Sequence, residues 1–313
     1  MSAPATTPAL TNSLLTGTEW SPAQLHGLFH LSGRLKTRPK HYREALTSRV
    51  LALVFERPSL RTRVTFEAAI ASLGGTSIFL DYTAAHLGDR ESIPDVARNL
   101  EGWIHCVVAR VFEQKTLDQL AGNARVPVLN ALSDRFHPCQ ALADFFTLQE
   151  RFGDLGGLKL AYVGGGNNVC HSLISIGARA GAHLRIATPV GYEPDPAVLA
   201  EAEDVARETH GRIEISRTPE EAVASAQAVY TDIWASMGRE DETALRQAAF
   251  AGYQVNEKLF SQTAPDAVFM HCLPVHRGLE VTDGVIDSPR SIVFDQAENH
   301  LHVQKAILLT LVS

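Results

Sequence analysis

The stretch VLALVFERPSLRTRVTFEAAIASLGG, residues 50–75, decides how the chain folds. Its first six residues, 50–55, are apolar without alternation, which is typical of a strand in a parallel sheet covered by helices on both faces. Pro58 marks a turn, Ser59 is a good N-cap, and apolar residues then recur with helical spacing up to the glycine pair at 74–75. The stretch therefore predicts a strand, a sharp turn and a helix, the repeating unit of an α/β protein.

Two arginines, Arg61 and Arg63, fall in the first turn of this predicted helix. Cations are disfavoured there, because the unpaired N–H groups and the helix dipole make that end positive. A bound phosphate would explain them, since free N–H groups and guanidinium groups both bind phosphate oxygens. The alternative is that both arginines face solvent or pair with Glu56 and Glu67. These residues alone do not decide between the two readings.

The composition is that of an ordinary globular protein. The chain has 313 residues, 45% of them hydrophobic and 20% charged, which suits two domains and excludes a disordered or fibrous protein. A net charge of −7 argues against general binding to nucleic acid or anionic membranes. The first 20 residues lack the features of a secretory signal, and no apolar run approaches 18 residues. We therefore expect a soluble, cytoplasmic protein.

The cysteines suggest neither a disulfide framework nor a zinc site. They are Cys106, Cys139, Cys170 and Cys272, without any C-x-x-C spacing, and we expect buried thiols. Cys170 and His171 are adjacent, and neighbouring residues on a helix point about 100° apart. We therefore expect no metal there.

Strand-like and helix-like segments alternate along the whole chain. Strands are expected at 50–55, 76–81, 106–111, 126–131, 158–163, 184–188, 212–216, 228–233, 267–270 and 291–294. A long helix over about 138–151 would bridge two halves, and a final helix would start near Glu298. The alternation predicts an α/β fold with two domains, each a parallel sheet flanked by helices. We place the domains at 1–145 and 146–290, with a C-terminal strand and helix, 291–313, packing back on the first domain.

Polar side chains gather where the predicted strands end, which is where α/β proteins bind ligands. In the first half, Arg110, His137 and Gln140 add donors to those near Arg61, a combination that favours an anion. In the second half, the corresponding groups are Asn167, Asn168, Asp232, Ser236, Met237 and Cys272. A ligand with an anionic end and an amino-acid end would fit between the two sets.

Two motifs suggest other chemistries. The glycine turn GGGNN at 164–168 is similar to a dinucleotide-binding turn, but it lacks the G-x-G-x-x-G spacing and an acidic residue at the end of the next strand. This argues against an NAD-dependent oxidoreductase. Cys272 lies close in sequence to His271 and His276, so a cysteine hydrolase remains an alternative.

Taken in order, the motifs resemble the aspartate/ornithine carbamoyltransferase family over nearly the whole chain. They are FERPSLRTR, HLGDRES, VARVF, ALSDRFHPCQALADFFTLQE, GGGNNVCHS, ATPVGYEPDP, VYTDIWASMGRE, HCLPVHRG and SPRSIVFDQAEN. The S-M-G loop is similar to that of the ornithine-using members. The resemblance implies transfer of the carbamoyl group of carbamoyl phosphate to the δ-amine of L-ornithine, giving L-citrulline and phosphate, in arginine biosynthesis or, reversed, in arginine catabolism. Putrescine or an acylated ornithine is the alternative acceptor, and a catalytically weakened binding protein is the alternative class.

The resemblance also implies a role for each site residue. Carbamoyl phosphate would be bound by Ser59, Leu60 through its backbone N–H, Arg61, Thr62, Arg110, His137 and Gln140. Ornithine would be bound by Asn168, Asp232, Ser236 and Met237, with Cys272 and the Leu273 carbonyl near the δ-amine. Arg110 and His137 would polarise the carbonyl group, while Cys272 and Asp232 would help to deprotonate the amine, so no metal or cofactor is required. The family forms trimers, in which His86 would reach a neighbour's carbamoyl phosphate.

Two positions depart from the family's usual pattern. Leu60 replaces a threonine, which removes a hydroxyl donor at a cost of about 1 kcal/mol. His300 stands where an arginine usually helps to hold carbamoyl phosphate, and a histidine of ordinary pKa is mostly neutral at pH 7. We therefore expect weaker binding of carbamoyl phosphate that improves below about pH 6.5.

Overall fold

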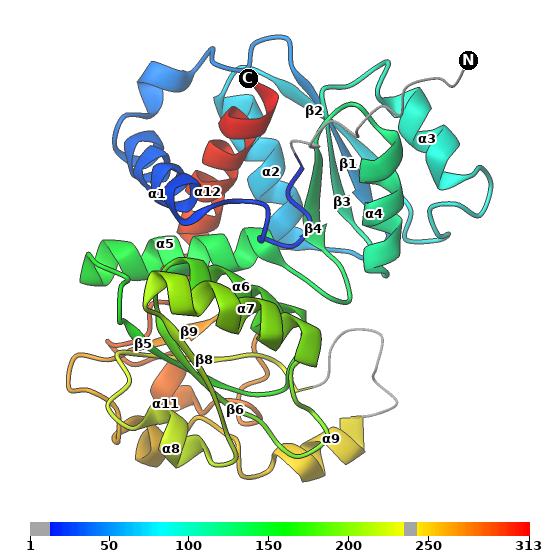
Figure 1. The fold of residues 1–313 in the computed structure, drawn as a ribbon. Coiled ribbons are helices and arrows are strands. Elements are labelled where there is room, and N and C mark those ends of the chain that lie inside the picture. The colour runs from blue at the N-terminus through cyan, green and yellow to red at the C-terminus, as the bar shows by residue number, and fades with distance from the viewer. Residues whose placement is uncertain (1–12, 235–242) are drawn as a thin grey trace, which may run out of the picture.

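The computed structural model describes residues 13–234 and 243–313, and this part of the chain builds two parallel sheets (Figure 1). The first sheet has the strand order β2-β1-β3-β4. Its strands are β1 (Val50–Phe55), β2 (Thr76–Asp81), β3 (Cys106–Arg110) and β4 (Val128–Leu132). The α/β fold predicted from the sequence is confirmed.

The central strand β1 is buried on both faces, as its unbroken apolar sequence predicts. Leu51, Leu53 and Phe55 join the core that contains the inner face of α2 (Leu60–Ser72), whereas Ala52 and Val54 face the opposite core. That second core is completed by α3 (Ile93–Leu100) and α4 (Gln114–Asn123). Helices therefore cover both faces of the sheet.

The second sheet has the order β7-β6-β5-β8-β9. Its strands are β5 (Lys159–Val163), β6 (His183–Ala187), β7 (Arg212–Ser216), β8 (Ala228–Thr231) and β9 (Val268–His271). The helices of this half are α6 (Asn168–Arg179), α7 (Pro196–Thr209), α8 (Pro219–Val223), α9 (Thr243–Phe250), α10 (Glu257–Phe260) and α11 (Asp283–Ile286). Leu160 and Tyr162 pack toward α6 and α7, while Ala161 and Val163 pack toward α8, α10 and α11.

Two long helices join the halves. Helix α5 (Pro138–Phe152) packs against α6 of the second half and against α12 (Val293–Val312). Helix α12 also packs against α2 and against α1 (Pro22–Thr37), which is followed by the short 3-10 helix η1 (Pro39–Tyr42). Figure 1 shows the red C-terminal helix beside α1, so the return of this helix to the first domain is confirmed. The predicted boundary between residues 145 and 146 falls within α5 and stays a prediction.

The strand predicted at 291–294 is wrong. Ser291 makes a single bridge to Phe269, and α12 already begins at Val293, five residues before Glu298. The buried residues of this helix include a row at spacings of three or four positions, at 293, 296, 300, 303 and 307. The apolar letters at its start thus belong to a helix. The other nine predicted strands are confirmed, with ends that differ by at most two residues.

The cysteines and the membrane prediction can be compared with the structure directly. All four thiols are free, and three are buried, whereas Cys272 is partly exposed. Among the helices described, none has the length and apolar character needed to cross a bilayer.

Candidate active site

A cavity of about 380 Å³ lies between the two halves, at the C-terminal ends of β1, β3, β8 and β9. The start of α2, the starts of α5 and α6, and the first turns of α12 complete its wall. The lining includes twelve of the predicted site residues: Ser59, Leu60, Arg61, Thr62, Arg110, His137, Gln140, Asn168, Asp232, Cys272, Leu273 and His300. The structure therefore brings together residues that are more than 200 positions apart in the sequence.

The start of α2 separates the two arginines of the S-L-R-T-R motif. Ser59 caps the helix, because its Oγ accepts a hydrogen bond of 3.3 Å from the Thr62 N–H. Arg61 lines the cavity. Arg63 instead pairs with Glu67 at 2.9 Å and lies over the Phe79 ring, so the predicted pairing with a glutamate is confirmed for Arg63, and the phosphate expected at Arg61 stays a prediction.

Three guanidinium groups converge on the first wall of the cavity, from Arg57, Arg61 and Arg110. Burial, and then the neighbouring charges of Arg57 and Arg61, lower the pKa of Arg110 to about 10. Burial also lowers the pKa of Arg61. Glu56, which precedes Arg57 in the sequence, accepts hydrogen bonds of 2.7 Å from two backbone N–H groups, those of Leu87 and Phe112. Gathering cations in this way is costly unless an anion binds between them.

Arg57 is a site residue that the sequence analysis missed. Its guanidinium carbon lies 4.3 Å from the centre of the Phe112 ring, and the residue lines the cavity. Its position in the sequence could have indicated this role. Arg57 is a basic residue in the turn between β1 and α2, close to the predicted donors Ser59 and Arg61.

His137 is a neutral donor or acceptor at the start of α5. Its backbone N–H donates to the Ser172 Oγ at 2.7 Å, which fixes the first turn of the helix. Burial, and then the charges of Arg110, His300 and Arg61, hold the pKa of His137 well below its usual value. An uncharged imidazole at this place can donate to a carbonyl oxygen without releasing a proton to solvent.

His300 projects from α12 toward the same wall. Burial, together with Arg61 and Arg110, lowers its pKa to about 4. Its Nδ1 lies 2.8 Å from the Gln304 amide nitrogen, and in this orientation of the amide the ring proton is on Nε2. The pKa of about 4 belongs to the pocket without a ligand, and a bound phosphate would raise the pKa of His300, so the expected gain in binding below about pH 6.5 stays a prediction.

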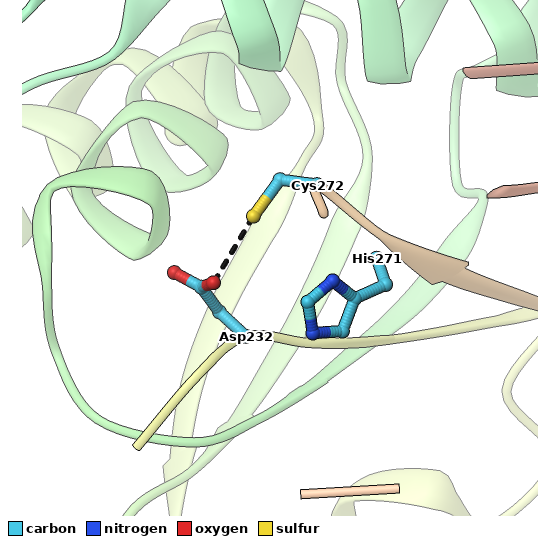
Figure 2. A group of neighbouring side chains, drawn as sticks. All are labelled: Asp232, His271 and Cys272. Carbon is cyan, nitrogen blue, oxygen red and sulfur yellow. Dashed lines mark hydrogen bonds between the residues drawn. The ribbon is translucent and has the colours of Figure 1, made fainter. Parts of the chain in front are cut away.

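The second wall is built around Asp232, which follows β8. Figure 2 shows the Cys272 thiol pointing at this carboxylate, and the Sγ–Oδ1 distance is 3.0 Å. The Asn167 amide donates to the other oxygen at 2.7 Å. Burial, and then the Asp232 carboxylate, hold the pKa of the Cys272 thiol well above its usual value. Cys272 is therefore a protonated thiol that donates to Asp232.

This arrangement argues against a cysteine hydrolase. A nucleophilic thiol needs a base that removes its proton, and the partner here is a carboxylate that holds it. His271 cannot serve as that base, because its Nδ1 accepts the Leu273 N–H at 2.8 Å while its Nε2 lies 3.4 Å from Glu280.

Asp232, His271 and Cys272 also offer ligand types that metals prefer. One candidate ligand atom from each lies within 4.8 Å of the others. Each of these side chains nevertheless has a protein partner already: Asn167 for Asp232, Leu273 for His271 and Asp232 for Cys272. The absence of a metal requirement stays a prediction.

The glycine turn before α6 is explained by packing. A Cβ on Gly166 would lie 2.2 Å from the Pro194 nitrogen, so only glycine fits. Asn167 caps α6 by accepting from the N–H groups of Val169 and Cys170, and the Asn168 amide donates to the Ser133 carbonyl at 2.6 Å. The turn therefore places Asn168 at the cavity wall and Asn167 against the Asp232 carboxylate.

Among the predicted site residues that the structure describes, His86 is the one that does not line the cavity. His86 lies in the connection between β2 and α3, 3.9 Å from Glu56 and against the Phe112 ring, where it lines a separate hollow. Ser236 and Met237 lie outside the described residues.

A cleft between two parallel-sheet domains, with guanidinium groups on one wall and a carboxylate, amide and thiol on the other, defines an enzyme that joins an anionic substrate to a polar acceptor. Residues 12–150 match the family model described as aspartate/ornithine carbamoyltransferase, carbamoyl-P binding domain. Residues 156–311 match the model of the Asp/Orn binding domain. The chain belongs to the aspartate/ornithine carbamoyltransferase family.

Proteins named ornithine carbamoyltransferase are similar to this chain over nearly its whole length. The ornithine carbamoyltransferase of Thermus thermophilus is 50% identical over 302 residues, which cover 96% of this chain and 97% of that protein. The crystal structure of that enzyme aligns with a TM-score of 0.88 over 97% of this chain and 100% of the other. The ornithine carbamoyltransferase of Pyrococcus furiosus aligns with a TM-score of 0.93 at 45% identity, over 98% and 99%. The family predicted from the sequence motifs is confirmed.

Proposed function

We propose that the protein transfers the carbamoyl group of carbamoyl phosphate to the δ-amine of L-ornithine, giving L-citrulline and phosphate. One observation carries the proposal: three guanidinium groups and an Asp232–Cys272 pair face the same cavity from opposite domains. The first wall suits a phosphorylated donor, and the second suits an amine acceptor. The names of the relatives agree with this assignment.

The donor wall suggests how the carbamoyl carbon is activated. Arg61, with the free N–H groups at the start of α2, would bind the phosphate and stabilise it as it leaves. Arg110 and the neutral His137 would donate to the carbonyl oxygen, which becomes an oxyanion when the amine attacks. Ser59, Thr62, Gln140, His300 and the backbone N–H of Leu60 complete the proposed donor subsite.

The acceptor wall would orient ornithine and help its amine to lose a proton. A lysine-like amine titrates near 10.4, so its neutral form costs roughly 4 to 5 kcal/mol at pH 7. Asp232 would attract the ammonium group and take part in its deprotonation, while the Cys272 thiol holds the carboxylate in place. Asn168, with Ser236, Met237 and the Leu273 carbonyl, would recognise the rest of the amino acid. No metal or cofactor is needed for these steps.

We also expect the finer properties that the family suggests. The protein would act in the cytoplasm, in the direction of citrulline and arginine synthesis, as a homotrimer. In that trimer, His86 would reach the carbamoyl phosphate of a neighbouring subunit, which fits its position outside the cavity of its own chain.

The test is a citrulline assay with carbamoyl phosphate and a panel of acceptors: ornithine, putrescine, N-acetylornithine and aspartate. We expect turnover with ornithine, because putrescine lacks the α-carboxylate that Asn168 would recognise. Arg61→Ala should lower kcat/KM by about a thousandfold, through loss of charge stabilisation at the phosphate. Arg63→Ala is the matched control and should stay within a few fold, because Arg63 pairs with Glu67 outside the cavity. Preferred turnover of putrescine, or equal losses in the two variants, would refute the assignment.

A further inference from the structure

Helix α5 carries a buried carboxylate that the mechanism above does not use. Asp144 lies one turn after Gln140 and is fully buried. Burial raises the pKa of its carboxyl to about 7, even though donors from Gln296, Gln140 and Tyr230 act to lower it. A carboxyl in such a place destabilises the fold when it ionises, so its presence calls for an explanation.

Asp144 accepts hydrogen bonds from two glutamines on different helices. Its Oδ1 lies 2.8 Å from the Gln140 amide nitrogen and 2.9 Å from the Gln296 amide nitrogen. The orientation of Gln296 is set independently, because its Oε1 accepts the His271 backbone N–H at 3.0 Å. A backbone N–H can only donate, so Gln296 must turn its NH₂ group toward Asp144.

The orientation of the Gln140 amide follows in the same way. Its NH₂ group is held by the Asp144 oxygen, which leaves its Oε1 for the cavity that it lines. An amide oxygen only accepts hydrogen bonds, and the carbamoyl –NH₂ group offers hydrogen atoms that need an acceptor. Without Asp144, the Gln140 amide could turn over and present its own NH₂ group to the cavity. Two NH₂ groups cannot hydrogen-bond to each other, so this orientation would disfavour the carbamoyl –NH₂ group of the substrate.

We propose that Asp144 is a positioning residue for the donor substrate: it holds Gln140 with its Oε1 toward the cavity, so that the site selects a carbamoyl –NH₂ group over a methyl group at the same place. The proposal rests on the proposed function, because it takes carbamoyl phosphate as the donor. Its chemistry can be tested separately, since acetyl phosphate has the same shape as carbamoyl phosphate and carries a methyl group in place of the –NH₂.

The experiment measures the affinities of carbamoyl phosphate, acetyl phosphate and inorganic phosphate by titration calorimetry, without ornithine. The wild-type protein should prefer carbamoyl phosphate over acetyl phosphate by about tenfold or more, because a site built to pair with a polar group rejects the analogue that lacks it. Asp144→Ala should reduce this preference to about one, as Gln140→Ala does, while the affinity for inorganic phosphate changes by less than about threefold. Adding Asp144→Ala to Gln140→Ala should cause no further loss, because the group that it orients is already gone.

Three further variants separate positioning from other roles. Asp144→Asn keeps an acceptor oxygen that Gln296 holds in place, so it should retain most of the preference. Asp144→Val also lacks an acceptor oxygen but fills more of the space, so it replaces Asp144→Ala in the experiment if that variant does not fold. Thr147→Val is the control. It changes a buried side chain one turn after Asp144 on α5, whose Oγ1 accepts a hydrogen bond of 3.0 Å from Asn299, and it should keep the wild-type preference for carbamoyl phosphate.

The outcomes are distinct. The proposal is overturned if both non-accepting variants keep the preference, if Asp144→Ala and Gln140→Ala act additively, or if Asp144→Asn loses as much as Asp144→Ala, which would point to a role for the charge. A wild-type protein that discriminates as expected, but makes no citrulline from ornithine, would refute the proposed acceptor and leave the positioning role supported.

Discussion

At the residue scale, His300 is the cavity residue at which the sequence analysis expects a departure from the family pattern. His300 offers one N–H group and no charge over most of the pH range, because its pKa in the free pocket is about 4. Three arginines remain to balance a phosphate that carries up to two negative charges. The charge on this wall therefore comes from the three arginines, and His300 adds a neutral ring.

Restoring the charge should tighten the donor subsite. His300→Arg should lower the KM for carbamoyl phosphate by about tenfold at pH 7.5, since a guanidinium can form paired, charge-assisted bonds with phosphate. The same change should lower the thermal midpoint of the free protein, because a further cation joins Arg61 and Arg110 in a buried site. His302→Arg adds the same charge on α12 where the side chain pairs with Glu298, and it should leave KM unchanged. Equal effects of the two variants on KM would contradict a local role for His300.

Asp144 should make the stability of the protein depend on pH. Its folded-state pKa of about 7 lies above the unfolded value of 3.8, so the folded protein binds this proton more tightly. The resulting stabilisation is present below about pH 4 and is lost as the pH rises to about 7. Asp144→Asn removes the ionisation and should raise the free energy of unfolding by about 2–4 kcal/mol at pH 8, with little gain near pH 4. Urea titrations at both pH values measure this, and a gain that is equal at both would exclude the ionisation as its cause.

Most cavity residues could be predicted from the sequence, because they follow strand ends or begin helices. Spacing could not separate Arg61 from Arg63, which lie about 200° apart on a helix, since either one could have faced the cavity. Asp144 could not be found at all. Its importance depends on Gln296, 152 positions later, and only the packing of α5 on α12 brings the two together.

At the element scale, many cavity residues lie in short turns or at the starts of helices, and the strands and helices fix the positions of these segments. The error at 291–294 shows the limit of local patterns, because three apolar residues in a row fit a strand as well as the first turn of a helix. The glycine turn before α6 shows the opposite case. Its sequence resembles a nucleotide motif, and the structure explains it by the close approach of another segment of backbone.

The turn therefore gives a prediction about stability. Gly166→Ala should lower the free energy of unfolding by about 1–3 kcal/mol, because its Cβ would meet the Pro194 and Glu193 backbone, which cannot move aside cheaply. Gly27→Ala is the contrasting control in α1, where nothing lies within 4 Å of the added carbon, and it should stabilise the protein by about 0.5–1 kcal/mol. Chemical denaturation of both variants measures the difference. A tolerated alanine at position 166 would reopen the question of why the turn contains three glycines.

At the scale of the whole molecule, the cavity is assembled by packing between halves. Helices α5 and α12 both contact elements of the two halves, and residues of both line the cavity. The sequence could predict two sheets from the alternation of strands and helices, but not the angle at which their edges meet. That geometry comes from the side chains between α5, α6 and α12, which belong to one continuous core.

The proposed trimer leads to a prediction that concerns two subunits together. If each site uses Arg61 of one subunit and His86 of the next, then Arg61→Ala and His86→Ala subunits should restore activity when they share a trimer. Any mixed ring of the two contains one intact junction, so trimers purified through a different tag on each variant should show about one third of wild-type activity. Arg61→Ala mixed with His137→Ala is the control and should stay inactive, because both residues line the same chain's cavity. Mixed trimers of Arg61→Ala and His86→Ala that remain inactive would show that His86 does not serve a neighbour's site.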